Sequence, residues 1–170
     1  MTGNGTGKRL VAYFSASGVT GRAARALAQA AGADLFEIVP EDPYTTADLD
    51  WRNRRSRSSL EERDPSVRPA VASAVGDMDD YDTVFVGFPI WWGHEPAIVD
   101  TFLGQYDFSG KTVVPFATSG GSGAGGSDRR LRSACPTAGV LLPAKLVNGM
   151  GEGALGAWAA SVARQHGGCR

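Results

Sequence analysis

The sequence has few cysteines, no large excess of either charge and no long apolar run. Cys135 and Cys169 are the only cysteines among 170 residues, and neither they nor His94 and His166 have a metal-site spacing. A small secreted scaffold would carry more cysteines. The formal net charge is −1, whereas nucleic-acid-binding proteins usually have a strong basic excess. We therefore expect no disulfide framework, no metal site and no nucleic-acid partner.

The apolar segments are too short for a membrane protein. None approaches the ~20 residues that a helix needs to cross a bilayer. Residues 1–8 are polar and Gly-rich, and they lack the apolar region of a signal peptide. We expect a soluble, cytoplasmic protein without membrane insertion, with a flexible tail over residues 1–8 and one domain over residues 9–170.

Short apolar runs alternate with helical patterns along the chain. Strands are predicted over residues 10–14, 35–39, 83–87, 112–117 and 140–147, the last interrupted by Pro143. Helices are predicted over 23–31, within 46–63, and over 96–103, 127–135 and 155–163, with Ser127 as an N-cap and Gly32 and Gly167 after helix ends. The strands lack polar alternation, which is typical of burial on both faces. The pattern predicts an α/β fold, a three-layer doubly wound sheet of five parallel strands.

Pro115 lies inside the fourth predicted strand, where proline is poorly tolerated. A bulge or a locally open ladder at this position would reconcile the residue with a central strand.

Ligands of open doubly wound sheets bind beyond the carboxyl ends of the strands, so the loops that follow strands one, three and four matter most. The first loop, residues 15–20, has three hydroxyl side chains and one glycine before a helix. A helix N-terminus offers free N–H groups and a partial positive charge, which suits a phosphate. An ordinary capped turn is the alternative. No Gly-Lys-Ser/Thr follows, so a nucleoside triphosphatase is not indicated.

The loop after the third strand contains the adjacent residues Trp91 and Trp92. Tryptophan in such a loop could fill the core, cover a partner surface or stack on a flat aromatic ligand. Adjacent residues of an extended loop point in different directions, so at most one of the two is expected to meet a ring face.

The loop after the fourth strand, residues 118–127, is rich in glycine and serine. Glycine lets the backbone approach a ligand closely, and a flexible linker is the plainer alternative. Residues 120–124 miss the last glycine of a Gly-x-Ser-x-Gly hydrolase elbow and follow the wrong strand for it. The three loops together indicate a phosphorylated flat aromatic ligand, and FMN fits.

With these blocks the chain resembles the flavodoxin family, most closely a bacterial flavodoxin-like subgroup, from about Arg9 to the final helix. The resemblance is carried by residues 11–20, 87–93 and 110–121. It implies strand order 2-1-3-4-5 and a Pro-Phe pair in strand four. The phosphate of FMN would be held by Ser15, Ser17, Gly18, Val19 and Thr20. The flavin ring would be flanked by Pro89, Ile90, Trp91, Trp92, Gly93, Thr118, Ser119, Gly120, Gly121, Ser122 and Gly123. Ser17 stands where the family usually has threonine and keeps the hydroxyl.

The resemblance implies a non-covalent FMN protein that transfers electrons, with a redox partner protein, a small-molecule electron acceptor or NAD(P)H as its partner. Electron-carrier flavodoxins are typically strongly acidic, and this chain is near neutral. The first alternative is an FMN-dependent NAD(P)H:quinone-type oxidoreductase, and the second is a non-redox interaction module that has lost its flavin. Either a monomer or a homodimer is compatible with the sequence.

Two further features carry hypotheses. His94 could border the flavin and ease its reduction when protonated, or it could be a surface residue beside Glu95. The arginines at 52, 54, 55 and 57 could meet a nucleotide phosphate or an acidic partner, or form a solvated helix face.

Overall fold

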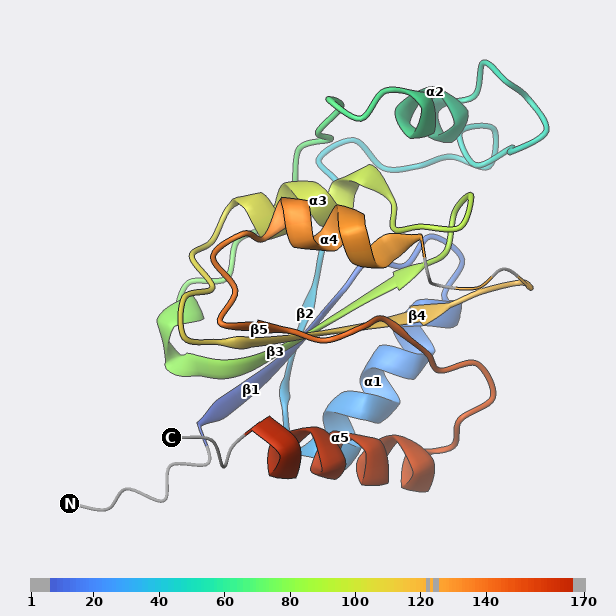
Figure 1. The fold of residues 1–170 in the computed structure, drawn as a ribbon. Helices are drawn as coiled ribbons and strands as arrows, with labels where there is room; N and C mark the ends of the chain where they lie inside the picture. Colours follow the sequence, from blue (N-terminus) through green and yellow to red (C-terminus); the bar gives the residue numbers. More distant parts are fainter. Residues whose placement is uncertain (1–6, 122, 124–125, 167–170) are drawn as a thin grey trace.

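The computed structural model describes residues 7–121, 123 and 126–166, which form one sheet between two layers of helices (Figure 1). The strands are β1 (Lys8–Tyr13), β2 (Asp34–Glu37), β3 (Tyr81–Pro89), β4 (Thr112–Thr118), β5 (Val140–Leu141) and β6 (Lys145–Leu146). The helices are α1 (Val19–Ala31), α2 (Arg57–Arg63), α3 (Ala97–Gly104), α4 (Ser127–Ala134) and α5 (Glu152–His166), with a 3₁₀ turn, η1 (Met78–Asp80), before β3. No helix in these ranges is long and apolar enough to cross a membrane.

The sheet has the order β2-β1-β3-β4-β5, and β6 pairs with β4 beyond β5. Every pairing is parallel, so the predicted three-layer, doubly wound fold with order 2-1-3-4-5 is confirmed. Helices α3 and α4 cover one face of the sheet, and α1 and α5 cover the other (Figure 1).

Each central strand contributes to two separate cores. Val84 and Val86 of β3 pack in the core that contains α3, whereas Phe85 between them packs in the core that contains α1 and α5. Successive side chains of a strand point to opposite faces, so a strand covered on both faces needs apolar residues throughout. This arrangement explains the strands without polar alternation.

Pro115 sits in β4 without disturbing the pairing with β3, where it lies opposite Val86 in a continuous register. The Val113 and Ala117 carbonyls accept hydrogen bonds from Leu142 and Val147, so the odd-numbered residues of β4 face the β5–β6 side. Pro115, which has no N–H, therefore faces the interruption between β5 and β6. The ladder is locally open at this point, as one of the two sequence-based expectations had it.

The second predicted helix, expected within residues 46–63, is present only as α2. Residues 45–55 form turns in which side-chain oxygens of Asp48, Asp50 and Asn53 accept backbone N–H groups. Such local bonds compete with helix formation. Ser56 then caps α2 by accepting the Ser59 N–H. The β2–β3 connection, residues 38–80, thus becomes a long segment beyond α3, which we call the long connection (Figure 1).

Several boundaries differ from the sequence-based expectations. Gly126, not Ser127, is the N-cap residue of α4, because Ser127 is already helical. Strand β2 ends at Glu37, two residues before Val39, since Pro40 turns away to bridge Val71. The C-cap of α1 is Gly32 in a left-handed conformation, as predicted. Lys8 already belongs to β1, while residues 1–6 of the expected tail and the helix stop at Gly167 lie outside the described residues.

Candidate functional site

Three loops meet at the carboxyl edge of the sheet. The Thr20 hydroxyl of α1 lies 2.7 Å from the Thr118 hydroxyl at the end of β4, and both side chains are buried. The Ile90 N–H donates to the Thr118 carbonyl at 2.9 Å, which joins the loop after β3 to the loop after β4. The predicted loops therefore form one site rather than three separate turns.

The β1–α1 loop exposes the start of α1. The Ser15 hydroxyl accepts the N–H groups of Gly18 and Gly21, both at 3.1 Å, and this holds the loop in a compact turn. Gly18 has φ 91°, a left-handed conformation that favours glycine. Among the described residues no acceptor meets the N–H groups of Val19 and Thr20. These free donors at a helix N-terminus form a site for an anion.

The tryptophan loop is a tight hairpin turn. Trp91 and His94 exchange backbone hydrogen bonds at 2.9 and 3.2 Å, and the two residues between them, Trp92 and Gly93, have φ 53° and 81°. Positive φ at both central positions is the signature of a type I′ turn. Trp92 is the one non-glycine residue with positive φ in the described ranges, and this conformation costs a bulky residue about 1–2 kcal/mol.

The two tryptophans of the hairpin have different surroundings. The Trp91 ring is half-buried and meets Phe14 and Tyr44 edge-on, with ring centroids 5.6 and 5.5 Å apart. Trp92 stands at the tip with 41% of its surface exposed. Trp91 therefore anchors the hairpin in the core, and Trp92 is the one with an open surface.

The Gly-rich loop is fixed at its start by Asn148. The Asn148 side chain accepts the Ser119 N–H and donates to the Ser119 carbonyl, both at 2.8 Å. The Ser119 hydroxyl accepts the Gly121 N–H at 3.1 Å, and Gly120 between them has no acceptor for its own N–H in the described part of the chain. Ser122 lies outside the described residues, so its predicted role has no structural counterpart.

A cavity of about 520 Å³ lies between these loops and the long connection. From the predicted set it is lined by Ile90, Trp91, Trp92, Ser119, Gly120 and Gly121. The β1–α1 loop, Pro89, Gly93, Thr118 and Gly123 are not part of this lining, although Thr118 bonds to Thr20 beside it.

Three lining residues come from the long connection and were missed from the sequence: Leu49, Trp51 and Ser58. Trp51 is 67% exposed, and the buried Ser58 hydroxyl has no partner within the described chain. Trp51, an aromatic residue in a polar run, was a usable signal. Leu49 and Ser58 gave none, because only the tertiary structure brings them to the cavity.

His94 does not line this cavity. Its Nδ1 lies 2.8 Å from the Glu95 carbonyl oxygen, and its Nε2 faces the Glu62 carboxylate of α2 at 3.6 Å. With 13% of the side chain exposed, it is not a surface residue either. The surface interpretation of His94 is therefore wrong, whereas its position beside the flavin stays a prediction.

A buried pair of acids lies behind the hairpin. Arg130 of α4 approaches Glu95 Oε1 at 3.1 Å and Asp100 Oδ2 at 3.6 Å, while Glu95 Oε2 and Asp100 Oδ1 have no donor in the described chain. Burial, reinforced by the Asp100 charge, raises the pKa of Glu95 to about 8. Burial also raises the pKa of Asp100. The raised pKa of Glu95 favours a proton on this pair near neutral pH, and a proton shared between the two carboxyl groups would satisfy both orphaned oxygens.

Neither a metal-type cluster nor a reactive thiol is found among the described residues. The described residues contain no cluster of three or more His, Cys, Asp or Glu side chains suited to a metal. Cys135 is buried, its thiol donates to the Leu131 carbonyl, and burial raises its pKa to about 11. It is therefore an inert core residue.

The fold and the site define a doubly wound α/β protein with a helix N-terminus that has free N–H groups, and an aromatic-lined cavity, at the carboxyl edge of its sheet. The family model described as flavodoxin matches residues 8–162. The chain therefore belongs to the flavodoxin family. None of the curated proteins matches it.

Solved structures share this fold. A candidate flavoprotein from Bacteroides eggerthii is 50% identical, with 92% of this chain and 98% of that one covered and a TM-score of 0.87. One from Bacteroides uniformis is 45% identical, with 91% and 98% covered and a TM-score of 0.85. A flavoprotein from Lactobacillus acidophilus, solved in complex with FMN, shares the fold at 19% identity, with 82% and 93% covered and a TM-score of 0.68.

Proposed function

We propose that this protein binds FMN non-covalently and transfers electrons through it. The observation that carries the proposal is the convergence of an anion site and an aromatic cavity at one edge of the sheet, joined through Thr20 and Thr118. Membership of the flavodoxin family and the FMN complex of the Lactobacillus acidophilus relative support the choice of ligand.

The phosphate of FMN would lie at the start of α1. The free N–H groups of Val19 and Thr20 and the exposed hydroxyl of Ser17 supply donors, and the helix dipole favours the negative charge. The Ser15 hydroxyl instead accepts two backbone N–H groups, so its role is to shape the loop. The Thr20 hydroxyl lies 2.7 Å from the Thr118 hydroxyl, and it would be free to donate to the phosphate when Thr118 is the donor of this pair.

The flavin ring would lie in the cavity between Trp92 and the Gly-rich loop. Trp92 offers an exposed indole, and the N–H of Gly120 borders the cavity without an acceptor among the described residues. When bound, FMN supplies the redox chemistry, and the protein provides its orientation, its hydrogen bonds and its exposure to a partner. Trp91 and Asn148 act indirectly, because they fix the hairpin and the Gly-rich loop.

A reductive titration of the FMN-loaded protein tests electron transfer. We expect reversible bleaching of the bound flavin by a chemical reductant and recovery of the spectrum when a small-molecule acceptor is added. Rapid bleaching by NADH or NADPH alone would assign the protein to the oxidoreductases. A flavin that stays bound but is neither reduced nor reoxidised would contradict the proposal.

A further inference from the structure

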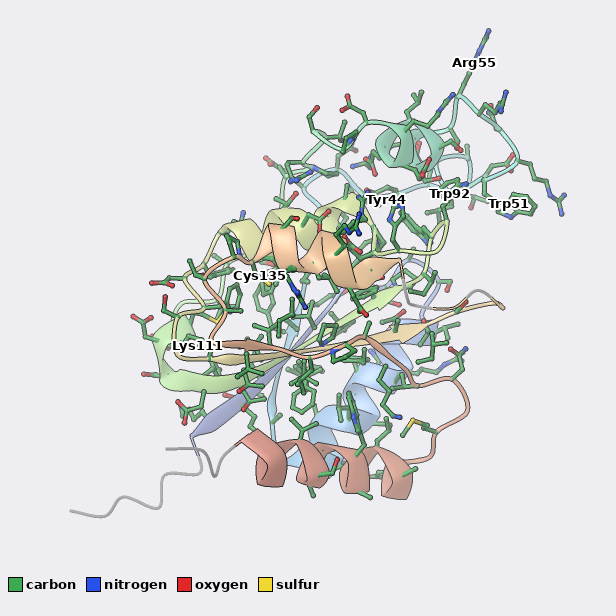
Figure 2. All side chains as sticks on the ribbon, viewed as in Figure 1. Tyr44, Trp51, Arg55, Trp92, Lys111 and Cys135 are labelled. Carbon is green, nitrogen blue, oxygen red and sulfur yellow. The ribbon has the colours of Figure 1, made fainter. Side chains whose placement is uncertain are left out.

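Trp51 is an exposed aromatic residue at the edge of the cavity, outside the proposed position of the flavin between Trp92 and the Gly-rich loop. It lines the cavity together with Trp92, yet 67% of its surface is open to solvent. In Figure 2 the two side chains lie at the outer edge of the long connection, on the same side of the molecule. An indole left this exposed forgoes much of the stabilisation that burial would give it, so its position calls for a function.

The segment that carries Trp51 is firmly attached to the body of the protein. Arg57 stacks over the Tyr44 ring at 3.9 Å and pairs with Glu61, whose carboxylate also accepts the Tyr44 hydroxyl. Tyr44 in turn packs against Phe14 and Trp91. Trp51 is thus presented from a braced segment, which lowers the entropy lost when a ligand binds.

The same segment carries unpaired positive charge. Residues 50–55 contain three arginines and one carboxylate, Asp50, which leaves a formal charge of +2. No carboxylate pairs with Arg52, Arg54 or Arg55 in the ranges that the structure describes. The Arg52 guanidinium lies 5.3 Å from the Trp51 ring centroid, so a cation adjoins the exposed indole. By contrast, Arg55 points away from the body of the molecule (Figure 2).

A positive charge at this place is not required by FMN itself. FMN carries one phosphate group, and its proposed donors are at the start of α1, which does not line the cavity that Trp51 borders. The buried Ser58 hydroxyl, also from the long connection, lines the cavity without a partner among the described residues. An indole, a guanidinium and a free hydroxyl together suit a flat ring that bears an anionic group.

We propose that Trp51, Arg52 and Ser58 form a site for a second substrate, a planar aromatic anion that enters the cavity beside the flavin. The inference rests on the proposed FMN site. Two kinds of molecule have this chemistry, a nicotinamide nucleotide and an anionic quinone. Trp51 would stack on the ring, Arg52 would pair with the phosphate or sulfonate, and Ser58 would hydrogen-bond to a polar edge of the ring.

The test measures dissociation constants by calorimetry for NADP⁺ and for anthraquinone-2-sulfonate, with the FMN-loaded protein. At least one probe should bind, and added salt should weaken the binding. Trp51→Ala should raise its dissociation constant about 3- to 10-fold, and Trp51→Phe should restore most of the affinity. Arg52→Ala should weaken binding and flatten the salt dependence, whereas the matched control Arg55→Ala should leave both unchanged. The probe that responds identifies the kind of substrate.

FMN affinity, measured separately by absorbance on the same variants, keeps the two proposals apart. It should be unchanged in Trp51→Ala. Loss of FMN affinity in that variant would make Trp51 a wall of the flavin site and overturn the inference. Binding of neither probe to a protein that holds FMN would also overturn it and leave an acidic protein partner as the occupant. A protein that never binds FMN would instead refute the proposed function.

Discussion

Substitution of Glu95 by Gln should flatten the pH dependence of stability. The Glu95 side chain has no exposed surface, and burial beside Asp100 raises its pKa from 4.5 to about 8. The folded protein therefore keeps a proton that the unfolded chain releases between these two pH values. Glutamine has nearly the same shape and stays neutral at every pH, so it removes this titration and leaves Arg130 an acceptor oxygen.

Proton linkage determines the sign and size of this pH effect on the unfolding free energy. Because the folded state binds more protons than the unfolded state between about pH 4.5 and 8, the contribution is fully present below pH 4.5 and is lost as the pH rises through about 8. One proton gives a slope of at most about 1.4 kcal/mol per pH unit. From pH 5 to 8 the native protein should therefore lose on the order of 3 kcal/mol more unfolding free energy than Glu95→Gln.

Urea denaturation followed by circular dichroism at several pH values between 5 and 8 measures this difference. Glu41→Gln is the matched control, because Glu41 is an exposed carboxylate and should leave the slope unchanged. Parallel stability profiles for the native protein and Glu95→Gln would refute the shared-proton account of the Glu95–Asp100 pair.

Three other substitutions test the geometry of the site. Gly87→Ala would place a Cβ 2.3 Å from the Phe116 ring, so urea denaturation should show a loss of about 1–3 kcal/mol, and an unchanged midpoint would contradict this packing. In Gly18→Ala the added Cβ meets no atom within 4 Å, but the left-handed backbone strains alanine. This variant should lose about 1–2 kcal/mol of unfolding free energy and bind FMN more weakly. Equal FMN affinity would show that the turn does not shape the phosphate site. Asn148→Ala removes two hydrogen bonds to Ser119 and should raise the FMN dissociation constant about 10-fold in a fluorescence titration. An unchanged dissociation constant would show that the Gly-rich loop holds its shape without them.

The layered fold was predictable because hydrophobic pattern and chain connectivity determine it. Apolar runs without alternation predict strands buried on both faces, and parallel strands joined by helices leave few possible architectures. The relation between Pro115 and Pro143 could be predicted only in part. Each proline could be recognised as unfavourable in a strand, but only the strand register shows that Pro115 faces the interruption between β5 and β6 that contains Pro143.

The long connection could not be predicted, since its structure depends on contacts far apart in sequence. Its turns are formed by local side-chain bonds, and its position is fixed by Tyr44 against Phe14 and Trp91. For the same reason the sequence missed Leu49, Trp51 and Ser58, and it did not reveal that His94 faces a carboxylate of α2. The three loops were found because each follows a strand whose end was already predicted.

The central claim, that FMN binds at the three loops, is tested most directly by the visible absorption spectrum of the protein after incubation with FMN and desalting. We expect retained flavin bands at ~370 and ~450 nm, in a ratio of about one flavin per chain. A desalted protein without these bands, from a preparation that is folded by circular dichroism, would contradict it.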